Sequence, residues 1–108
     1  MVVEVADIRT PEGAQAAFEE AIRRGLDTVL STADGFVGYR LLAGVESPDR
    51  YLLLITWETL EHHTVGFRES ALYADWSAIV RPFFAAPPQV EHFSPVLDSA
   101  SGSASASA

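Results

Sequence analysis

The spacing of apolar and polar residues divides the chain into six predicted elements, in the order strand, helix, strand, strand, helix, strand. The first strand, VVEVADI at 2–8, is rich in β-branched residues and is followed by TPEG at 10–13. Thr10 is a residue type that caps helices and Pro11 suits a first helical turn, so we expect a helix to begin at residue 11. Apolar residues then recur every three or four positions as far as Ala33, which is typical of a helix with one face on a core.

The middle of the chain predicts a hairpin. Strands are expected at 36–46 and 50–58, joined by the turn SPDR at 47–50, and so short a connection requires antiparallel strands. Helical periodicity follows Trp57, breaks near Ser70 and stops at Pro82 and the later proline pair, after which QVEHFSPV at 89–96 is the last strand. This order predicts an α+β, ferredoxin-like βαββαβ fold, with a four-stranded antiparallel sheet and two helices on one face.

The third predicted strand is apolar on both of its faces. One face carries Tyr51, Leu53, Ile55 and Trp57, and the other carries Leu52 and Leu54. Two helices can cover only one face of the sheet, so we expect the second face to pack on another copy of the chain. The pattern therefore predicts a homodimer whose two sheets meet in a barrel-like core.

Length and composition limit the classes of protein that the chain can be. The 108 residues suffice for one domain, expected at 1–97, and the Ser-, Ala- and Gly-rich segment 98–108 is expected to be a disordered tail. A formal charge of -8 disfavours nucleic acid as a partner. The apolar run YLLLIT at 51–56 is too short to span a bilayer, and the first residues lack the pattern of a signal peptide. We therefore expect a soluble cytoplasmic protein that does not enter a membrane.

Several residue types and motifs are missing from the sequence. It contains no Cys, Lys or Asn, which excludes thiolate chemistry, Cys-ligated metals and a Schiff-base lysine. It also contains neither a GxGxxG nor a GxxxxGK[ST] motif, so the usual nucleotide cradles are absent. Any reaction must use His, Arg, Trp, Tyr, Ser, Thr or carboxylates.

The segment WETLEHHTVGFRES at 57–70 concentrates the candidate chemistry. On a helix, His62 and His63 point about 100° apart, so they do not form a paired site. Glu58 and His62 have helical metal-ligand spacing and His92 is a conceivable third ligand, but this pattern has low specificity, and we expect no metal and a solvated His62 paired with Glu58. His63 lies on the inward face, where it is either a hydrogen-bonded core residue or a group that transfers a proton near neutral pH.

The segment WETLEHHTVGFRESALY at 57–73, preceded by GFVGYRL at 35–41 and followed by VEHF at 90–93, resembles the antibiotic biosynthesis monooxygenase family of dimeric ferredoxin-like proteins. The resemblance extends from residue 1 to about residue 96, and it places His63 rather than His62 at the family position. It implies oxygenation of a small aromatic substrate, such as a polycyclic phenol, a quinol or an anthrone, by O2 without metal, flavin or other cofactor.

The resemblance also suggests roles for particular residues. His63 would be the base, and Arg68 and the indole of Trp76 would donate to the substrate anion and to the peroxide that follows. The residues expected to bind the flat substrate, together with Trp76, are Phe36, Tyr39, Phe67, Tyr73 and Phe83.

Other activities of the same fold remain as alternatives. Haem degradation is disfavoured, because the sequence has no Asn, has Gly66 near the expected Trp and has Trp76 near the position of the expected axial His. An isomerase or an enzyme that degrades a small signalling molecule is compatible with the residues present. So is a non-catalytic dimer that only binds a hydrophobic metabolite.

Overall fold

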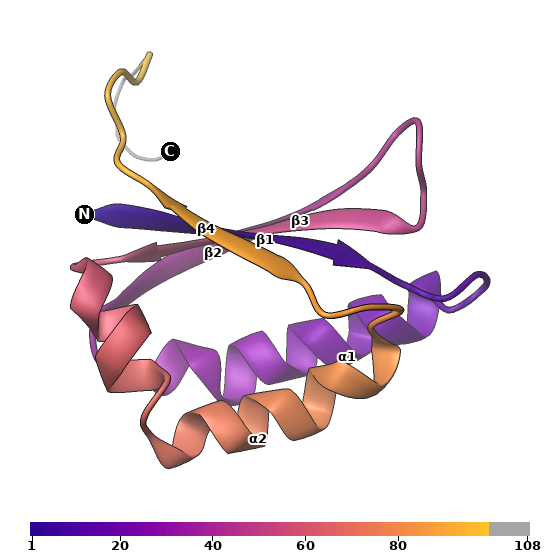
Figure 1. The fold of residues 1–108 in the computed structure, drawn as a ribbon, viewed down its shortest axis with the longest axis horizontal. Coiled ribbons are helices and arrows are strands. Elements are labelled where there is room, and N and C mark those ends of the chain that lie inside the picture. Colours follow the sequence, from indigo (N-terminus) through magenta and orange to yellow (C-terminus); the bar gives the residue numbers. More distant parts are fainter. Residues whose placement is uncertain (100–108) are drawn as a thin grey trace.

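The computed structural model describes residues 1–99 and contains a four-stranded antiparallel sheet with two α-helices on one face (Figure 1). The strands are β1 (Val2–Arg9), β2 (Phe36–Ala43), β3 (Arg50–Trp57) and β4 (Gln89–Phe93), and the helices are α1 (Gln15–Thr28) and α2 (Ala71–Val80). The order across the sheet is β2-β3-β1-β4, so the first and last strands of the chain are neighbours. The predicted ferredoxin-like α+β fold is confirmed. Residues 100–108, most of the predicted tail, lie outside the described residues.

The predicted start of the first helix at residue 11 is wrong. Residues 11–14 form a turn in which Gly13 has a φ of +81°, a conformation that side chains other than glycine rarely adopt, and α1 begins only at Gln15. Thr10 does not cap the helix, because its backbone N–H and its hydroxyl both donate to the carbonyl of Asp49. Thr10 therefore ties the end of β1 to the residue that precedes β3, before the turn and the helix begin.

The β2–β3 hairpin is shorter than predicted. Strand β2 ends at Ala43 rather than at residue 46, because Gly44 already donates its N–H to the carbonyl of Arg50, at 2.7 Å, and Arg50 donates to Ser47. Strand β3 extends over Arg50–Trp57, close to the predicted range.

The second helical region consists of two helices of different geometry. A π-helical turn, η2, spans His62–Phe67, and Arg68 donates its N–H to the carbonyl of His63, five residues earlier, at 3.1 Å. The predicted break near Ser70 is confirmed: the hydroxyl of Ser70 accepts the N–H of Leu72 and caps α2. The wide turn of η2 directs both His63 and Phe67 into the core.

The core lies between the sheet and the helices. Every second residue of β1 and β3 faces α1 and α2, and the alternation ends at Trp57, which is fully buried as predicted. Gly25 allows close contact between the helices, because a Cβ there would lie 3.0 Å from the ring of Trp76. The indole of Trp76 is thus held between α2 and α1.

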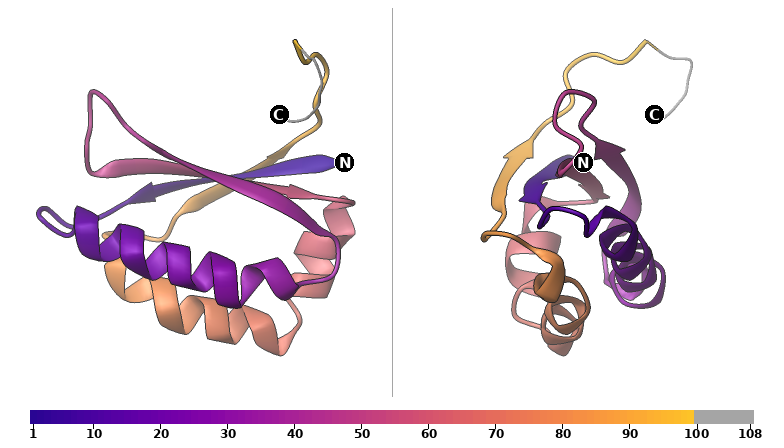
Figure 2. Two further views of the ribbon diagram at one scale, coloured as in Figure 1. Left: turned by 180° about the vertical axis from the view of Figure 1, so that it is seen from behind. Right: turned by 90° about the vertical axis from the view of Figure 1, so that its right-hand side faces the viewer.

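The opposite face of the sheet is uncovered in a single chain (Figure 2). Val3, Val5, Leu52 and Leu54 are half-buried there, although no helix packs on them. Leu42 and Phe93, from the two edge strands, are 37% and 51% exposed. No helix formed by residues 1–99 is long and apolar enough to cross a membrane.

Candidate active site

Four side chains from four different elements form a cluster of close polar contacts at one end of the sheet. Trp57 of β3 donates its indole N–H to Oε1 of Glu4 on β1, at 2.9 Å. Nε2 of His63, in η2, lies 3.3 Å from the same oxygen. Nδ1 of His63 lies 2.7 Å from Nε2 of His92 on β4. Both ring nitrogens of His63 are therefore engaged with protein groups.

The alternation of the strands and their register bring these residues together. Glu4 lies on the helix-facing side of β1, between Val2 and Ala6, and it is the only acidic residue on that side of the strand. His92 is paired directly with Glu4 in the β1–β4 register. The side chain of His63, which points from η2 toward the sheet, therefore meets a carboxylate and an imidazole on adjacent strands.

Aromatic rings fix the orientation of the His63 imidazole. It stacks on the indole of Trp57, with centroids 5.4 Å apart and an interplanar angle of 17°, and on the ring of Phe67, with centroids 6.2 Å apart and an angle of 27°. His63 is 2% exposed. The imidazole plane is held by packing, so its two nitrogens are directed along the plane toward Glu4 and His92.

Burial shifts the ionisation of all three titratable groups in the cluster. Desolvation raises the pKa of Glu4, and the hydrogen bond from Trp57 and the charge of Arg68 partly oppose this rise. Desolvation, together with the positive charge of Arg68, lowers the pKa of His63 to about 4 and also lowers the pKa of His92. At neutral pH His63 is therefore an uncharged imidazole.

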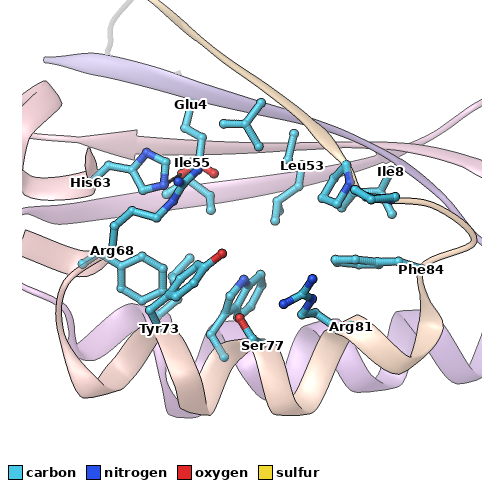
Figure 3. A pocket seen from close by; sticks show the side chains of 17 residues that line it. Glu4, Ile8, Leu53, Ile55, His63, Arg68, Tyr73, Ser77, Arg81 and Phe84 are labelled. Carbon is cyan, nitrogen blue, oxygen red and sulfur yellow. Dashed lines mark ion pairs between the residues drawn. The ribbon is translucent and has the colours of Figure 1, made fainter. Parts of the chain in front are cut away.

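A cavity of about 220 Å³ adjoins this cluster, between α2 and the sheet (Figure 3). Glu4, His63 and Arg68 lie at one end of it, and Ile8, Arg81 and Phe84 lie at the other. Tyr73 and Ser77 line the side formed by α2. The guanidinium of Arg68 lies over the ring of Tyr73, 5.6 Å from its centroid, at the same end of the cavity as Glu4 and His63.

The second oxygen of Glu4 is open to this cavity. Oε1 takes both contacts, from Trp57 and from His63, whereas Oε2 makes no hydrogen bond within residues 1–99. No fully buried side-chain nitrogen or oxygen among these residues lacks a partner, so Oε2 reaches open space. Because Glu4 lines the cavity, it presents a free carboxylate oxygen there, and His63 does not present a free nitrogen.

Five of the residues predicted from the sequence meet at the cavity. They are His63, Phe67, Arg68, Tyr73 and Trp76.

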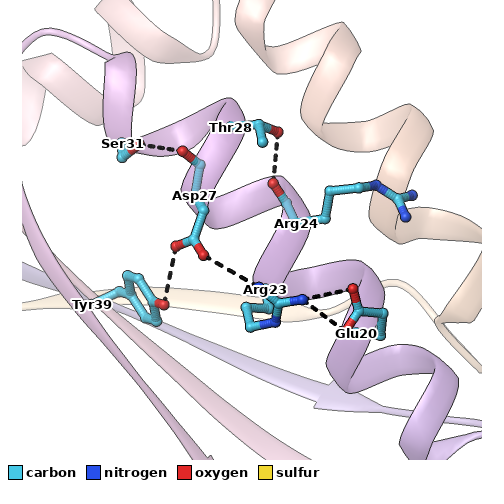
Figure 4. Close-up of polar contacts among 7 residues, drawn as sticks. All are labelled: Glu20, Arg23, Arg24, Asp27, Thr28, Ser31 and Tyr39. Atoms are coloured by element: carbon cyan, nitrogen blue, oxygen red, sulfur yellow. Dashed lines mark hydrogen bonds and ion pairs between the residues drawn. The ribbon is translucent and has the colours of Figure 1, made fainter.

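The other three predicted residues do not line this cavity. Phe36 packs edge-on against Trp57, with centroids 6.2 Å apart, and Phe83 packs against the core from the turn after α2. Tyr39 is on the edge strand β2, which lies beneath α1, and its hydroxyl donates to Asp27 of that helix at 3.3 Å (Figure 4). The cavity lies on the β1–β4 side of the sheet, which explains why aromatic residues of β2 are absent from it.

The residues considered for a metal site are not brought together. Nδ1 of His62 lies 2.8 Å from the hydroxyl of Thr59, which takes the place of the expected partner Glu58. His92 is paired with His63 instead. Among residues 1–99 no group of three or more His, Asp or Glu side chains is arranged to hold a metal ion.

Sequence reasoning did not single out all of the residues at the site. Among those it missed are Glu4, Ser77, Arg81 and Phe84 of the cavity lining, and it also missed the pairing of His92 with His63. The signal for Glu4 was its place as a lone carboxylate in the inward series of the first strand. Arg81 and Phe84 gave no such signal, because they follow the end of the helix, where the periodicity stops.

Comparisons with known proteins agree on one family and one fold. The sequence pattern of the family described as antibiotic biosynthesis monooxygenase matches residues 1–79. The chain is 41% identical over 96 residues to the uncharacterized protein YczJ of Bacillus subtilis (strain 168). The aligned region covers 89% of this chain and 100% of YczJ.

Solved structures give the same result. A candidate antibiotic biosynthesis monooxygenase from Bordetella bronchiseptica is 38% identical, with a TM-score of 0.84 over 89% of this chain and 97% of that one. SnoaB, a cofactor-independent oxygenase from Streptomyces nogalater, is 17% identical with a TM-score of 0.76, over 91% of this chain and 95% of that one. At this lower identity, the likeness to SnoaB concerns the fold.

Proposed function

Because the chain belongs to the antibiotic biosynthesis monooxygenase family, we propose that its cavity binds a small aromatic compound with an acidic O–H or C–H group and oxygenates it with O2, without a metal or flavin. The observation that carries the proposal is the buried Glu4–His63 pair beside Arg68, at one end of a cavity lined by aromatic side chains. A cavity of about 220 Å³ is smaller than the roughly 300–1,000 Å³ of sites for drug-sized ligands, which favours a compact ring system.

The first step is removal of a proton from the substrate. Oε2 of Glu4 faces the cavity, and the raised pKa of this carboxyl makes it a stronger base than a solvated glutamate. His63 acts through its contact with Oε1 rather than on the substrate directly, because both of its nitrogens are engaged. The base is thus the Glu4–His63 pair, which refines the assignment of His63 alone.

Positive charge and N–H donors stabilise the anion that results. Arg68, held over Tyr73, lies at the same end of the cavity as Glu4. The indole of Trp76 lines the cavity from α2. In many enzymes, the largest single contribution to the rate enhancement comes from hydrogen-bond donors that are already placed where negative charge develops in the transition state.

The reaction balances for a substrate such as an anthrone, whose reactive carbon carries two hydrogens. The carbanion transfers one electron to O2, and the radical pair combines into a carbon-bound peroxide, which is protonated. Loss of the second carbon-bound proton, with cleavage of the O–O bond, gives a ketone and water. The carbon loses four electrons and the two oxygen atoms gain them, one as the carbonyl oxygen and one in water.

Oxygen uptake tests the proposal. Purified protein with anthrone should consume O2 faster than the spontaneous oxidation, produce anthraquinone, and be unaffected by a chelator. Glu4→Gln and Arg68→Met should lower the rate, whereas Tyr39→Phe, which changes a residue outside the cavity, should not. Conversion of the substrate under argon without oxygen uptake would instead support an isomerase, and retention of the compound without any turnover would support a binding protein.

We also propose that the uncovered sheet face forms a homodimer. Val3, Val5, Leu52 and Leu54 supply a contiguous apolar surface in the centre of that face, and Leu42 and Phe93 extend it to both edges. Exposed apolar surface of this kind is typical of an interface. Pairing two such faces would enclose it between two sheets, each with its cavity on the outer, helix-covered side.

A further inference from the structure

We propose that the substrate carries a carboxylate at the end remote from its reacting carbon, and that Arg81, together with the hydroxyl of Ser77, binds this group. For turnover the inference rests on the proposed function, and for binding it rests on the geometry of the cavity. Glu4 and Arg68 lie at one end of the cavity, where the reaction is placed, and Arg81 lies at the other (Figure 3). Arg81 thus selects the compound that is bound without contacting the atoms that react.

The wall of the cavity formed by α2 is a row of hydrogen-bond donors. Tyr73, Ser77 and Arg81 follow one another at steps of four residues, and Arg81 keeps helical angles, so the three lie on one face and all line the cavity. No hydrogen bond or ion pair within residues 1–99 involves the two hydroxyls or the guanidinium. No fully buried side-chain nitrogen or oxygen in this range lacks a partner, so these donors reach open space.

The hydroxyl of Ser77 differs from other hydroxyls in helical turns. Thr28, Ser31 and Thr64 each donate to the backbone carbonyl four residues earlier, at 2.6, 2.9 and 3.2 Å, and Figure 4 shows the first two of these bonds. Such a bond is a usual way to satisfy a hydroxyl inside a helix. Ser77 makes no such bond to the carbonyl of Tyr73, so its hydroxyl is available to a ligand.

The charged residues that line the cavity reverse the balance of the whole chain. The sequence has 15 acidic residues and 7 arginines, but the lining contains two arginines and a single carboxylate, that of Glu4. Burial raises the pKa of Glu4, which favours its neutral form more than in a solvated glutamate. An anionic ligand is therefore attracted to the cavity although the protein as a whole is acidic.

The two ends of the cavity are far enough apart to hold two different groups of one ligand. Ile8 follows Glu4 by four residues on β1, which corresponds to about 13 Å at about 3.3 Å per residue. Arg81 follows Tyr73 by eight residues, which corresponds to about 12 Å at about 1.5 Å per residue. Side chains reach inward from both ends, so a compact fused ring with its reactive carbon beside Glu4 can bring a carboxylate on its outer ring to Arg81.

A carboxylate is the anion that fits the Arg81 end. A guanidinium can donate two parallel N–H groups to the two oxygens of a carboxylate, and the hydroxyl of Ser77 adds one more donor. The facing wall, formed by the sheet, is apolar and suits the ring that carries the carboxylate; it includes Ala6, Ile8, Leu53 and Val90.

Arg81 also follows the end of α2, where a positive charge stabilises the last carbonyls of the helix. This role requires the charge but no ligand, and it does not depend on whether a compound in the cavity is acidic or neutral. The preference for an acid over its neutral analogue therefore reports on the cavity, whereas the Tm reports on the helix.

The binding test compares 2-naphthoate with 2-naphthamide, a neutral compound of nearly the same shape, by isothermal titration calorimetry. The wild type should bind the acid more tightly. Arg81→Met should raise the Kd of the acid by about fivefold and leave that of the amide unchanged, a modest factor because Arg81 is exposed to solvent. Arg81→Lys, which keeps the charge, should retain part of the preference.

Two further variants complete the binding test. Arg24→Met removes an exposed arginine of α1 that does not line the cavity, and as the matched control it should keep the wild-type preference (Figure 4). Ser77→Ala should weaken binding of the acid by a smaller factor than Arg81→Met, so the test does not depend on the folding of one variant.

Three results would overturn the proposal. One is equal binding of the two compounds, or no binding of either, by the wild type. Another is a preference for the acid that persists in Arg81→Met, and a lower Tm in that variant would then leave Arg81 with the helix role alone. The third is a preference lost in Arg68→Met but not in Arg81→Met, because the anion would then lie at the reacting end.

Turnover separates this inference from the proposed function. Oxygen uptake should show a higher kcat/KM for anthrone that bears a carboxylate on an outer ring than for anthrone itself. Arg81→Met should remove this advantage by raising KM with little change in kcat, because a remote contact is made equally in the ground state and the transition state. An Arg81-dependent preference for 2-naphthoate without oxygen uptake on either anthrone would reject the oxygenase and leave the anion site standing. Oxygen uptake with a preference that does not depend on Arg81 would reject the anion site and leave the oxygenase standing.

Discussion

The two acidic residues of β1, Glu4 and Asp7, are three positions apart but lie on opposite faces of the sheet and differ in almost every physical respect. Glu4 faces the helices, is 7% exposed, and has a pKa raised by burial. Asp7 faces away from the helices, forms an ion pair of 2.7 Å with Arg50, and has a pKa lowered by the hydrogen bond from that arginine. One carboxylate is prepared to accept a proton, and the other is prepared to keep its charge.

The comparison shows that the face of a strand, more than the type of residue, determines what a carboxylate can do. On the inner face the side chain is excluded from water and surrounded by Trp57 and His63, so its charged form is costly and its proton affinity rises. On the outer face Arg50 stabilises the charged form, and solvent screens the rest of the field. The helices cover one face only, and the difference follows from that asymmetry.

Neutralising each carboxylate in turn gives the largest expected contrast. Glu4→Gln should lower kcat by about 10²–10⁴-fold, the usual contribution of a general base, because the amide still accepts from Trp57 but cannot take a proton. Asp7→Asn should leave kcat unchanged. Initial rates of oxygen uptake on anthrone, with circular dichroism to confirm folding, measure both. An equal decrease in kcat for the two variants would contradict the different roles assigned to the two carboxylates.

The buried histidine beside Glu4 makes a second contrast, in the dependence of stability on pH. The pKa of His63 is about 4 in the folded chain and about 6.5 when unfolded, so between these values the unfolded state binds more protons. Stability conferred by neutral His63 is present above pH 6.5 and is lost as the pH falls to about 4, by roughly 3 kcal/mol at most. The raised pKa of Glu4 acts in the opposite direction, because its stability contribution falls as the pH rises above 4.5.

Urea unfolding at several pH values tests this. His63→Phe, which keeps an aromatic ring against Trp57, should lose less stability than the wild type between pH 6.5 and 4, whereas His62→Gln should follow the wild type. A wild-type curve that is flat over this range would contradict a neutral, buried His63.

The order of elements could be predicted from periodicity, because alternation and three-to-four spacing are local properties of the sequence. The face of the third strand that meets the helices could not, because that strand is apolar on both faces. The helix start was missed because Gly13 adopts a positive φ and forms a turn, which a preceding Thr-Pro pair does not reveal. The π-helical turn was also invisible, since its apolar spacing resembles that of an α-helix. The π-helical turn shifts each backbone hydrogen bond to the carbonyl five residues earlier, but it does not change the spacing of apolar residues along the sequence.

The site itself was half predictable. His63, Arg68 and the neighbouring aromatic residues lie in one segment of the sequence, so they could be identified from the local pattern. The contact of Glu4 with His63 and the pairing of His92 join residues from the first strand, the middle and the last strand. That contact depends on the β1–β4 register, which places Glu4 opposite His92, and no local pattern specifies a register between the two ends of a chain.

The outer face gives a third prediction, about assembly. Leu54→Glu places a charge in the centre of the uncovered apolar surface and should raise the dimer dissociation constant by at least about 100-fold, while the folded monomer tolerates it because the position faces away from the core. Val45→Glu, at an 88% exposed position in the β2–β3 loop, is the matched control. Light scattering across a concentration series measures both. A wild-type chain that is monomeric at every concentration, or a Leu54→Glu chain that is as dimeric as the control, would remove the sheet interface.

The smallest expected effect is that of breaking the Asp7–Arg50 pair itself. The two side chains are 32% and 44% exposed, so solvent screens their attraction, and Asp7→Asn should change Tm by no more than about 5 °C. Its sign depends on pH in a defined way. A lowered pKa means that the contribution of Asp7 is present above its ordinary value of 3.8 and is lost as the pH falls below it, so wild type and variant should converge in acid. Added salt at pH 7 should narrow the same gap, whereas the buried Glu4–His63 contact should respond much less to salt. A Tm difference that persists at pH 2, or that does not depend on salt, would mean that Asp7 acts through packing and not through its charge.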